Sequence, residues 1–160
     1  MKAFSKIVFI ILLSSILFAC KKSEQFSDIP YLEFRRYQIK DSVDALGNLA
    51  KICELHLYFV DGDGDICLFD EDTIPPFDYN LFVNYFEIQN DSLSQIDVSP
   101  PFHIRIPNLT PSGQNKSLKV NVKYDVNITY RNSDTIKFDL KLFDRALNES
   151  DWVGTGLITL

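Results

Sequence analysis

Between residues 118 and 130, apolar and polar side chains alternate without exception. Every second side chain is aliphatic or tyrosine, and those between them are lysine, asparagine, aspartate or threonine. Because successive side chains of a β-strand point to opposite faces of a sheet, this pattern requires one buried face and one wet face. A helix, with its period of 3.6 residues, cannot separate the two kinds of side chain in this way. The stretch therefore predicts a long, half-buried strand.

Other stretches alternate in the same way but are shorter. The predicted strands are 31–39, 53–59, 80–89, 102–106, 118–130, 136–142 and 154–160, separated by turn-rich segments. About seven strands in about 130 residues favour an all-β, two-sheet sandwich of immunoglobulin or fibronectin type III character. The short turn at 131–134 fits less well, because it suits a hairpin, whereas an immunoglobulin sandwich crosses between its sheets there.

The first 20 residues are organised differently. Lys2 and Lys6 precede an apolar or small-residue run, 7–18, which ends in Leu17-Phe18-Ala19-Cys20. This run is too short for a bilayer-spanning helix, which needs roughly 20 residues, and is typical of a signal peptide. We therefore expect a signal peptide at 1–19, a tether at 20–30 and a single β-sandwich domain at 31–160.

The Ala19-Cys20 ending resembles the lipobox of bacterial lipoproteins. The resemblance implies cleavage before Cys20, acylation of its sulfur and its new amine, and anchoring in a membrane of the cell envelope, which we expect to be the outer membrane. Two or more acyl chains give lasting attachment where one does not. The alternative is an ordinary secretory signal peptide followed by a chance cysteine.

Export changes the charge of the chain. Residues 1–19 carry Lys2 and Lys6, two of the 16 lysines and arginines, and none of the 22 acids, so the net charge falls from −6 to −8. Nucleic acid would repel such a domain, and we expect no nucleic-acid partner.

An acidic loop is the one chemical constellation in the mature chain. Asp61, Asp63 and Asp65 alternate with glycines, and no lysine or arginine lies between Asp61 and Tyr79. Carboxylates brought together by a curled backbone suit a hard cation, and outside the cytoplasm calcium is the expected ion. Counting from Asp61, Asp72 takes position 12 of an EF-hand-like loop, but Ile66 stands where that loop needs glycine. The alternative is a bare turn whose aspartates cap their own backbone.

A second loop is expected to join this site. In immunoglobulin order, the loops after the second and sixth strands lie at the same end of the sandwich. The later loop holds Asp144, Asn148 and Ser150. We therefore predict that Asp144 or the Asn148 amide oxygen approaches the first loop. The predicted calcium ligands are Asp61, Asp63, Asp65, Asp72, Asp144 and Asn148.

Three segments carry a family resemblance. The stretches 59–66, 105–110 and 144–150 resemble segments of an uncharacterised lipoprotein family of the Bacteroidota, including its D-G-D-G-D-I motif. The third is also similar to the D-x-A-G-N-x-S loop of bacterial immunoglobulin-like domains. Cys67 and Leu147 stand where these patterns have glycine. The family has no established activity, so the resemblance implies a fold and a location only.

The remaining residues leave several functions open. Cys53 and Cys67 are expected to be two buried free thiols or, alternatively, one disulfide. No nucleophile elbow, phosphate loop or zinc spacing occurs. We predict a non-enzymatic adhesion, assembly or accessory binding module with a protein or glycan partner. The alternatives are a carbohydrate-binding accessory protein that uses the aromatics of 75–86, and a hydrolase with an unrecognised site.

Overall fold

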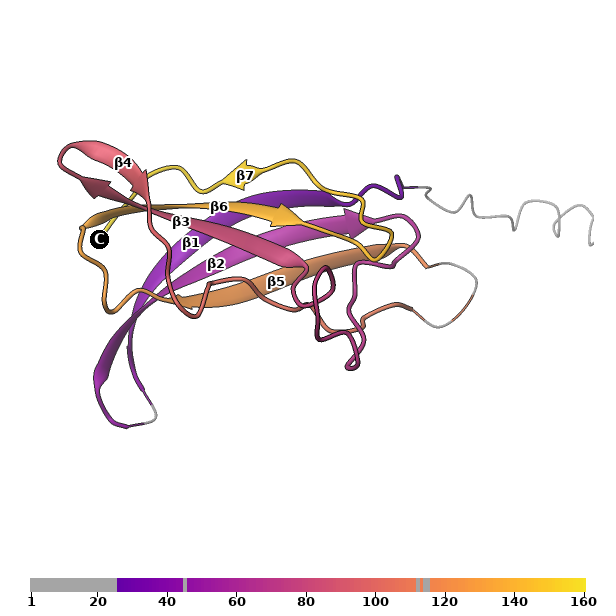
Figure 1. The fold of residues 1–160 in the computed structure, drawn as a ribbon, viewed down its shortest axis with the longest axis horizontal. Helices are drawn as coiled ribbons and strands as arrows, with labels where there is room; N and C mark the ends of the chain where they lie inside the picture. The colour runs from indigo at the N-terminus through magenta and orange to yellow at the C-terminus, as the bar shows by residue number, and fades with distance from the viewer. Residues whose placement is uncertain (1–25, 45, 112, 114–115) are drawn as a thin grey trace, which may run out of the picture.

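A computed structural model describes residues 26–44, 46–111, 113 and 116–160. The predicted signal peptide, Cys20 and the first part of the predicted tether lie outside the described residues. Within them the chain forms β-strands and no α-helix, arranged as two antiparallel sheets (Figure 1). The predicted all-β, two-sheet sandwich is confirmed.

One sheet has the order β1-β2-β5, and the other has the order β4-β3-β6-β7, with β8 also paired to β6. The bounds are β1 Tyr31–Val43, β2 Leu49–Asp61, β3 Leu81–Gln89, β4 Ser92–Gln95, β5 Leu118–Asn127, β6 Thr135–Leu142, β7 Val153–Gly154 and β8 Ile158–Thr159.

This order is the immunoglobulin-like Greek key. Strands β1, β2 and β5 take the places of strands A, B and E, and β3, β6 and the β7–β8 pair take those of C, F and G. Strand β4 lies at the edge where a C′ strand is found in related sandwiches. Because β5 and β6 belong to different sheets, the turn at 131–134 crosses the sandwich and does not close a hairpin.

The core lies between the two sheets and is made by the alternating side chains. Phe59 of β2 and Phe138 of β6 are the largest fully buried side chains. Burying a side chain of this size stabilises the fold by roughly 1.5–3 kcal/mol. The same alternation supplies the remaining inward residues, among them Leu55, Leu57, Val83, Tyr85, Val126, Leu140 and Leu142.

Two of the predicted strands differ in the structure. The stretch 102–106 forms only an isolated bridge between Ile104 and Leu81. The last predicted strand is divided into β7 and β8, because Gly156 between them has a φ of +71°. Strand β4 is additional to the prediction and follows a tight turn at Asn90 and Asp91, both with positive φ.

The loops after β2 and after β6 lie at the same end of the sandwich, as predicted. The chain enters the domain at this end too (Figure 1). Residues 26–30, assigned to the tether, lie against the loop after β2, where the Gly62 amide donates to the Ser27 carbonyl at 2.9 Å. The ordered contacts of the domain therefore begin before β1.

Candidate metal centre

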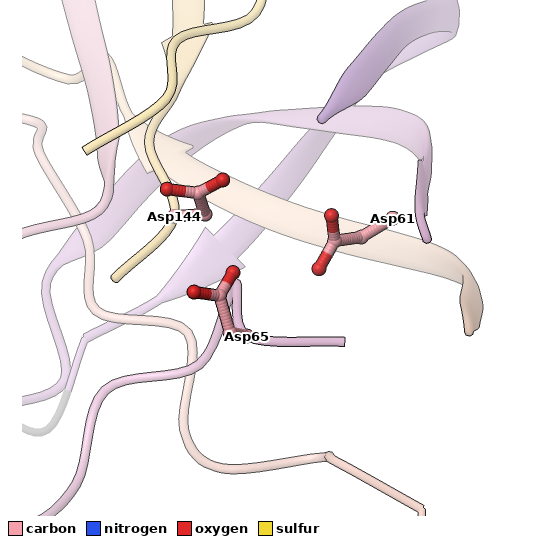
Figure 2. Close-up of side chains that lie close together, drawn as sticks. All are labelled: Asp61, Asp65 and Asp144. Atoms are coloured by element: carbon pink, nitrogen blue, oxygen red, sulfur yellow. The ribbon is translucent and has the colours of Figure 1, made fainter. Parts of the chain in front are cut away.

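Three carboxylates from separate parts of the chain meet at this end of the sandwich. Asp61 is the last residue of β2, Asp65 lies in the loop that follows, and Asp144 comes two residues after β6. One oxygen of each lies within 4.8 Å of the others. Figure 2 shows the three side chains directed toward a common space. Asp144 lies about 80 residues after the other two in the sequence, and the strand order brings the two loops together.

Each side chain is withdrawn from solvent to a different degree. Asp61 is completely buried, Asp144 is 2% exposed and Asp65 is partly buried. One oxygen of Asp61 accepts from the Ile66 amide at 3.3 Å, and one of Asp65 accepts from the Ala146 amide at 3.1 Å. Asp61 therefore caps its own loop, as expected for the bare turn, whereas Asp65 accepts from the other loop, and each contact occupies only one oxygen.

The second oxygens of Asp61 and Asp65 are the unusual feature of the site. Both Oδ1 atoms are buried and have no hydrogen-bond partner among the described residues. A buried charged oxygen without a donor costs free energy, and it is compensated in proteins by a proton, a water or a cation. A cation or a hydrogen-bond donor is therefore needed beside these two atoms.

The electrostatics agree with this geometry. Burial raises the pKa of Asp61 to about 7, with further increases from Asp63 and Asp65. Burial also raises the pKa of Asp65 to about 6, helped by the charges of Asp144 and Asp63. Near neutral pH, the cluster therefore competes for a proton unless another positive charge is present.

Glycines allow the first loop to reach this shape. Gly64 has a φ of +74°, and a Cβ there would collide with the carbonyl oxygen of Lys116. A Cβ at Gly62 would meet the carbonyl oxygens of Phe26 and Ser27. Both positions are closed to larger residues by neighbouring backbone, so the D-G-D-G-D sequence is needed for packing as well as for charge.

The second loop is held by its own hydrogen bonds. The Asn148 amide and side-chain nitrogens each donate to Asp144, both at 2.7 Å. Leu147, which lies between Asp144 and Asn148 in the sequence, has a φ of +65°, a left-handed conformation that normally favours glycine. The backbone shape expected for a glycine at this position is thus kept with leucine in its place.

The six predicted ligands therefore separate into groups. Asp61, Asp65 and Asp144 converge. Asp63 is exposed, yet close enough for its charge to raise the pKa of both loop partners. Asn148 orients Asp144 through its side-chain nitrogen. Asp72 is not brought to the cluster, because its carboxylate pairs with Arg145 and accepts from the Phe69 amide at 2.8 Å.

Arg105 was not identified from the sequence as part of this region. Its guanidinium donates to the carbonyls of Phe77 at 3.1 Å and Asp78 at 3.0 Å, and also to that of Asp72. A further bond at 3.0 Å reaches the carbonyl of Phe69. One side chain therefore holds the loop of residues 69–78 through its backbone. No pattern in the sequence reports such contacts, because any residue can supply a carbonyl.

The other reactive side chains have structural roles. Cys53 and Cys67 are both buried and unbridged. His103 accepts a hydrogen bond from the Val83 amide at 3.1 Å, and its ring contacts Tyr79 and Phe82. His56 bonds to Glu54 at 2.6 Å, on the outer face of β2. None of them contributes to the carboxylate cluster.

No protein-family model, curated protein sequence or solved structure gives a significant match to this chain. Within the residues that the structure describes, no helix is long and apolar enough to cross a membrane.

Proposed function

We propose that this chain is a lipid-anchored protein of the bacterial cell envelope, placed in the outer membrane, whose sandwich is stabilised by a calcium ion. It acts as a non-enzymatic adhesion, assembly or accessory binding module. The observation that supports the cation is the pair of buried, unpartnered oxygens on Asp61 and Asp65 beside the buried Asp144. The lipobox-like sequence ending at Cys20 supports the anchor.

Calcium fits the ligand set better than other common ions. It binds carboxylate oxygens at about 2.3–2.6 Å, so two ligands of one ion are at most about 5 Å apart. One oxygen of each of the three carboxylates lies within 4.8 Å of the others, which agrees with that spacing. Magnesium, with ligands at about 2.0–2.1 Å, requires a tighter set. Zinc and copper favour histidine or cysteine, neither of which lies in the cluster.

The N-terminal segment relates the cation site to the membrane. Asp28 offers its carbonyl to the Asn148 side chain at 3.5 Å, and Ser27 bonds to Gly62 in the acidic loop. If Cys20 carries lipid, six residues along the chain separate it from Phe26, and such a length can span no more than about 22 Å. The cation end would then face the bilayer, and the opposite end of the sandwich would be free for a partner.

Replacing Cys20 tests the anchor. In growing cells, the wild-type protein should incorporate radiolabelled palmitate and fractionate with membranes, because two or three acyl chains hold it there. Cys20→Ser should incorporate no label and leave the membrane fraction. Cys53→Ala, which changes a buried thiol and leaves Cys20 intact, should label as the wild type does. Unchanged fractionation of Cys20→Ser would refute the lipid anchor.

Calcium stabilisation should also depend on pH. Since the pKa of Asp61 is raised in the fold, its protonated form stabilises the protein below about pH 4, and this stabilisation is lost as pH rises toward 7. Calcium replaces the proton only once the carboxylates are ionised. The rise in melting temperature with calcium should therefore be larger at pH 8 than at pH 5, as measured by calorimetry. An equal rise at both values would argue against binding at this cluster.

Residues 75–86 do not form the aromatic surface that the carbohydrate-binding alternative requires. Its aromatic residues are all partly or fully buried. Phe82 meets His103 at 54° and Phe143 at 65°, so these rings do not share a plane. A flat, exposed surface for stacking on sugars is absent from this described segment. A site for such a ligand has to be sought elsewhere on the domain.

A further inference from the structure

A pocket of about 520 Å³ opens at the end of the sandwich opposite the carboxylate cluster. Its walls are the end of β3, the segment 96–102, the end of β5 and the crossing segment 128–132. The volume lies within the range of about 300–1,000 Å³ that is usual for small-molecule sites. The pocket exists because β5 is an edge strand and the chain leaves it here to cross to the other sheet.

A buried acid, Glu87, belongs to the lining of this pocket. Glu87 is 1% exposed, and its Oε1 accepts from the Tyr85 hydroxyl at 2.7 Å and from the Asn132 amide at 3.1 Å. Among the residues that the structure describes, its Oε2 has only a longer contact to the same amide, at 3.3 Å. A carboxylate can accept about four hydrogen bonds. Glu87 therefore retains acceptor capacity after its own protein contacts.

A cation with few partners lies beside it. Arg131 donates to the Ile128 carbonyl at 3.4 Å, and its ion pair with Asp134 is long, at 3.6 Å, with Asp134 mostly exposed. Its Nε is buried without a hydrogen-bond partner among the described residues. A guanidinium has five N–H donors, and most of those of Arg131 are unused. Arg131 lines the pocket, so its donors outside these two contacts can reach a ligand there.

The remaining walls are apolar and aromatic. Phe102 packs edge-on against Tyr85, with ring centroids 5.4 Å apart, and Ile96 and Val98 lie next to it in the lining. At the rim stands Tyr130, which is 88% exposed. Tyr130 is the most exposed large hydrophobic side chain of the described residues, so its ring is open to solvent. Its face is available to a ligand.

We propose that this pocket binds a neutral, hydroxylated ring of mono- or disaccharide size. A hydroxyl group can donate to Glu87 and accept from Arg131, while the apolar face of the ring packs against Tyr130 and Phe102. An anion would lose to Glu87 what it gains from Arg131, and an organic cation the reverse, so the pocket favours neither charge, whereas a purely apolar ligand would leave both groups unsatisfied. The inference deepens the binding role proposed above and needs neither the cation nor the lipid.

Nuclear magnetic resonance titration of the isotope-labelled protein tests the proposal. The probes are D-glucose, D-galactose and N-acetylglucosamine, with cyclohexanol as an apolar ring and D-glucuronate as an anion. We expect at least one sugar to give saturable shifts at amides of 85–87, 96–102 and 127–132. Glucuronate should bind no more tightly than glucose, and cyclohexanol should not reproduce the shifts.

Two variants and a control make the outcome decisive. Arg131→Gln and Tyr130→Ala should each weaken binding at least about tenfold, and the exposed Tyr130 can be changed without loss of the fold. Arg36→Gln, on the outer face of β1, should bind as the wild type does. Absence of saturable shifts with all three sugars would overturn the proposal, as would equal binding of cyclohexanol that Arg131→Gln does not weaken. Either result would leave the calcium and palmitate tests untouched.

Discussion

Millimolar calcium should raise the melting temperature of the protein by about 10 °C, and Asp61→Asn should abolish this rise. A ligand present at 100 times its dissociation constant stabilises the folded state by about 2.7 kcal/mol, which corresponds to roughly 10 °C for a domain of this size. Asparagine keeps the shape of the side chain and an oxygen for the Ile66 amide, but it removes the charge that the cation needs. Calorimetry with calcium and with a chelator measures both values.

The controls separate loss of the ion from loss of the fold. Asp70→Asn removes an exposed acid of the same loop and should keep the full rise. Without calcium, Asp61→Asn should melt at or above the wild-type temperature, because it removes a buried charge that repels Asp63 and Asp65. The calcium hypothesis fails if wild-type protein shows no rise, or if Asp61→Asn shows the same rise.

Arg105→Ala should lower the free energy of unfolding by about 3 kcal/mol, because charge-assisted hydrogen bonds contribute about 1.5–3 kcal/mol each and are not fully additive. The carbonyls of Phe77 and Asp78 would lose their donor, and that of Phe69 would keep only the bond from the Asp72 amide. Urea unfolding measures the loss, and cleavage within 69–78 by a protease should become faster. The stability of Arg105→Lys should fall between those of the wild type and Arg105→Ala, because a single ammonium group cannot reach all of these carbonyls.

Arg36→Ala is the matched control for Arg105. Arg36 is exposed on β1, and its removal should change stability by no more than about 0.5 kcal/mol, as is usual for surface positions. If Arg105→Ala were equally mild, the loop of residues 69–78 would have to be held by other contacts, such as the pair between Arg145 and Asp72.

Alternation predicted the long strands because burial of one face is a local property of the sequence. It misled at 102–106, where inward and outward residues alternate but prolines at 100, 101 and 107 remove backbone donors. There a side chain replaces the ladder, with His103 accepting from the Val83 amide. Strand β4 was missed although Asn90 and Asp91 suit the left-handed turn before it.

For the carboxylate cluster, too, part of the arrangement could be predicted from the sequence and part could not. The expected strand order predicts that Asp144 approaches the D-G-D-G-D turn, because the two loops share one end of the sandwich, and the structure brings them together. Counting positions as in an EF-hand loop predicts Asp72 as a ligand, and the structure instead pairs it with Arg145. Spacing along the chain could not reveal this, since Arg145 comes from a different loop.

Anomalous diffraction is the most direct test of the cation site. Crystals of the protein grown with calcium, measured at a long wavelength, should show one anomalous peak at about 2.3–2.6 Å from an oxygen of each of Asp61, Asp65 and Asp144. Crystals of Asp61→Asn should lack this peak. An empty map between the three carboxylates, or a peak only at exposed acids such as Asp70, would contradict the proposed calcium site.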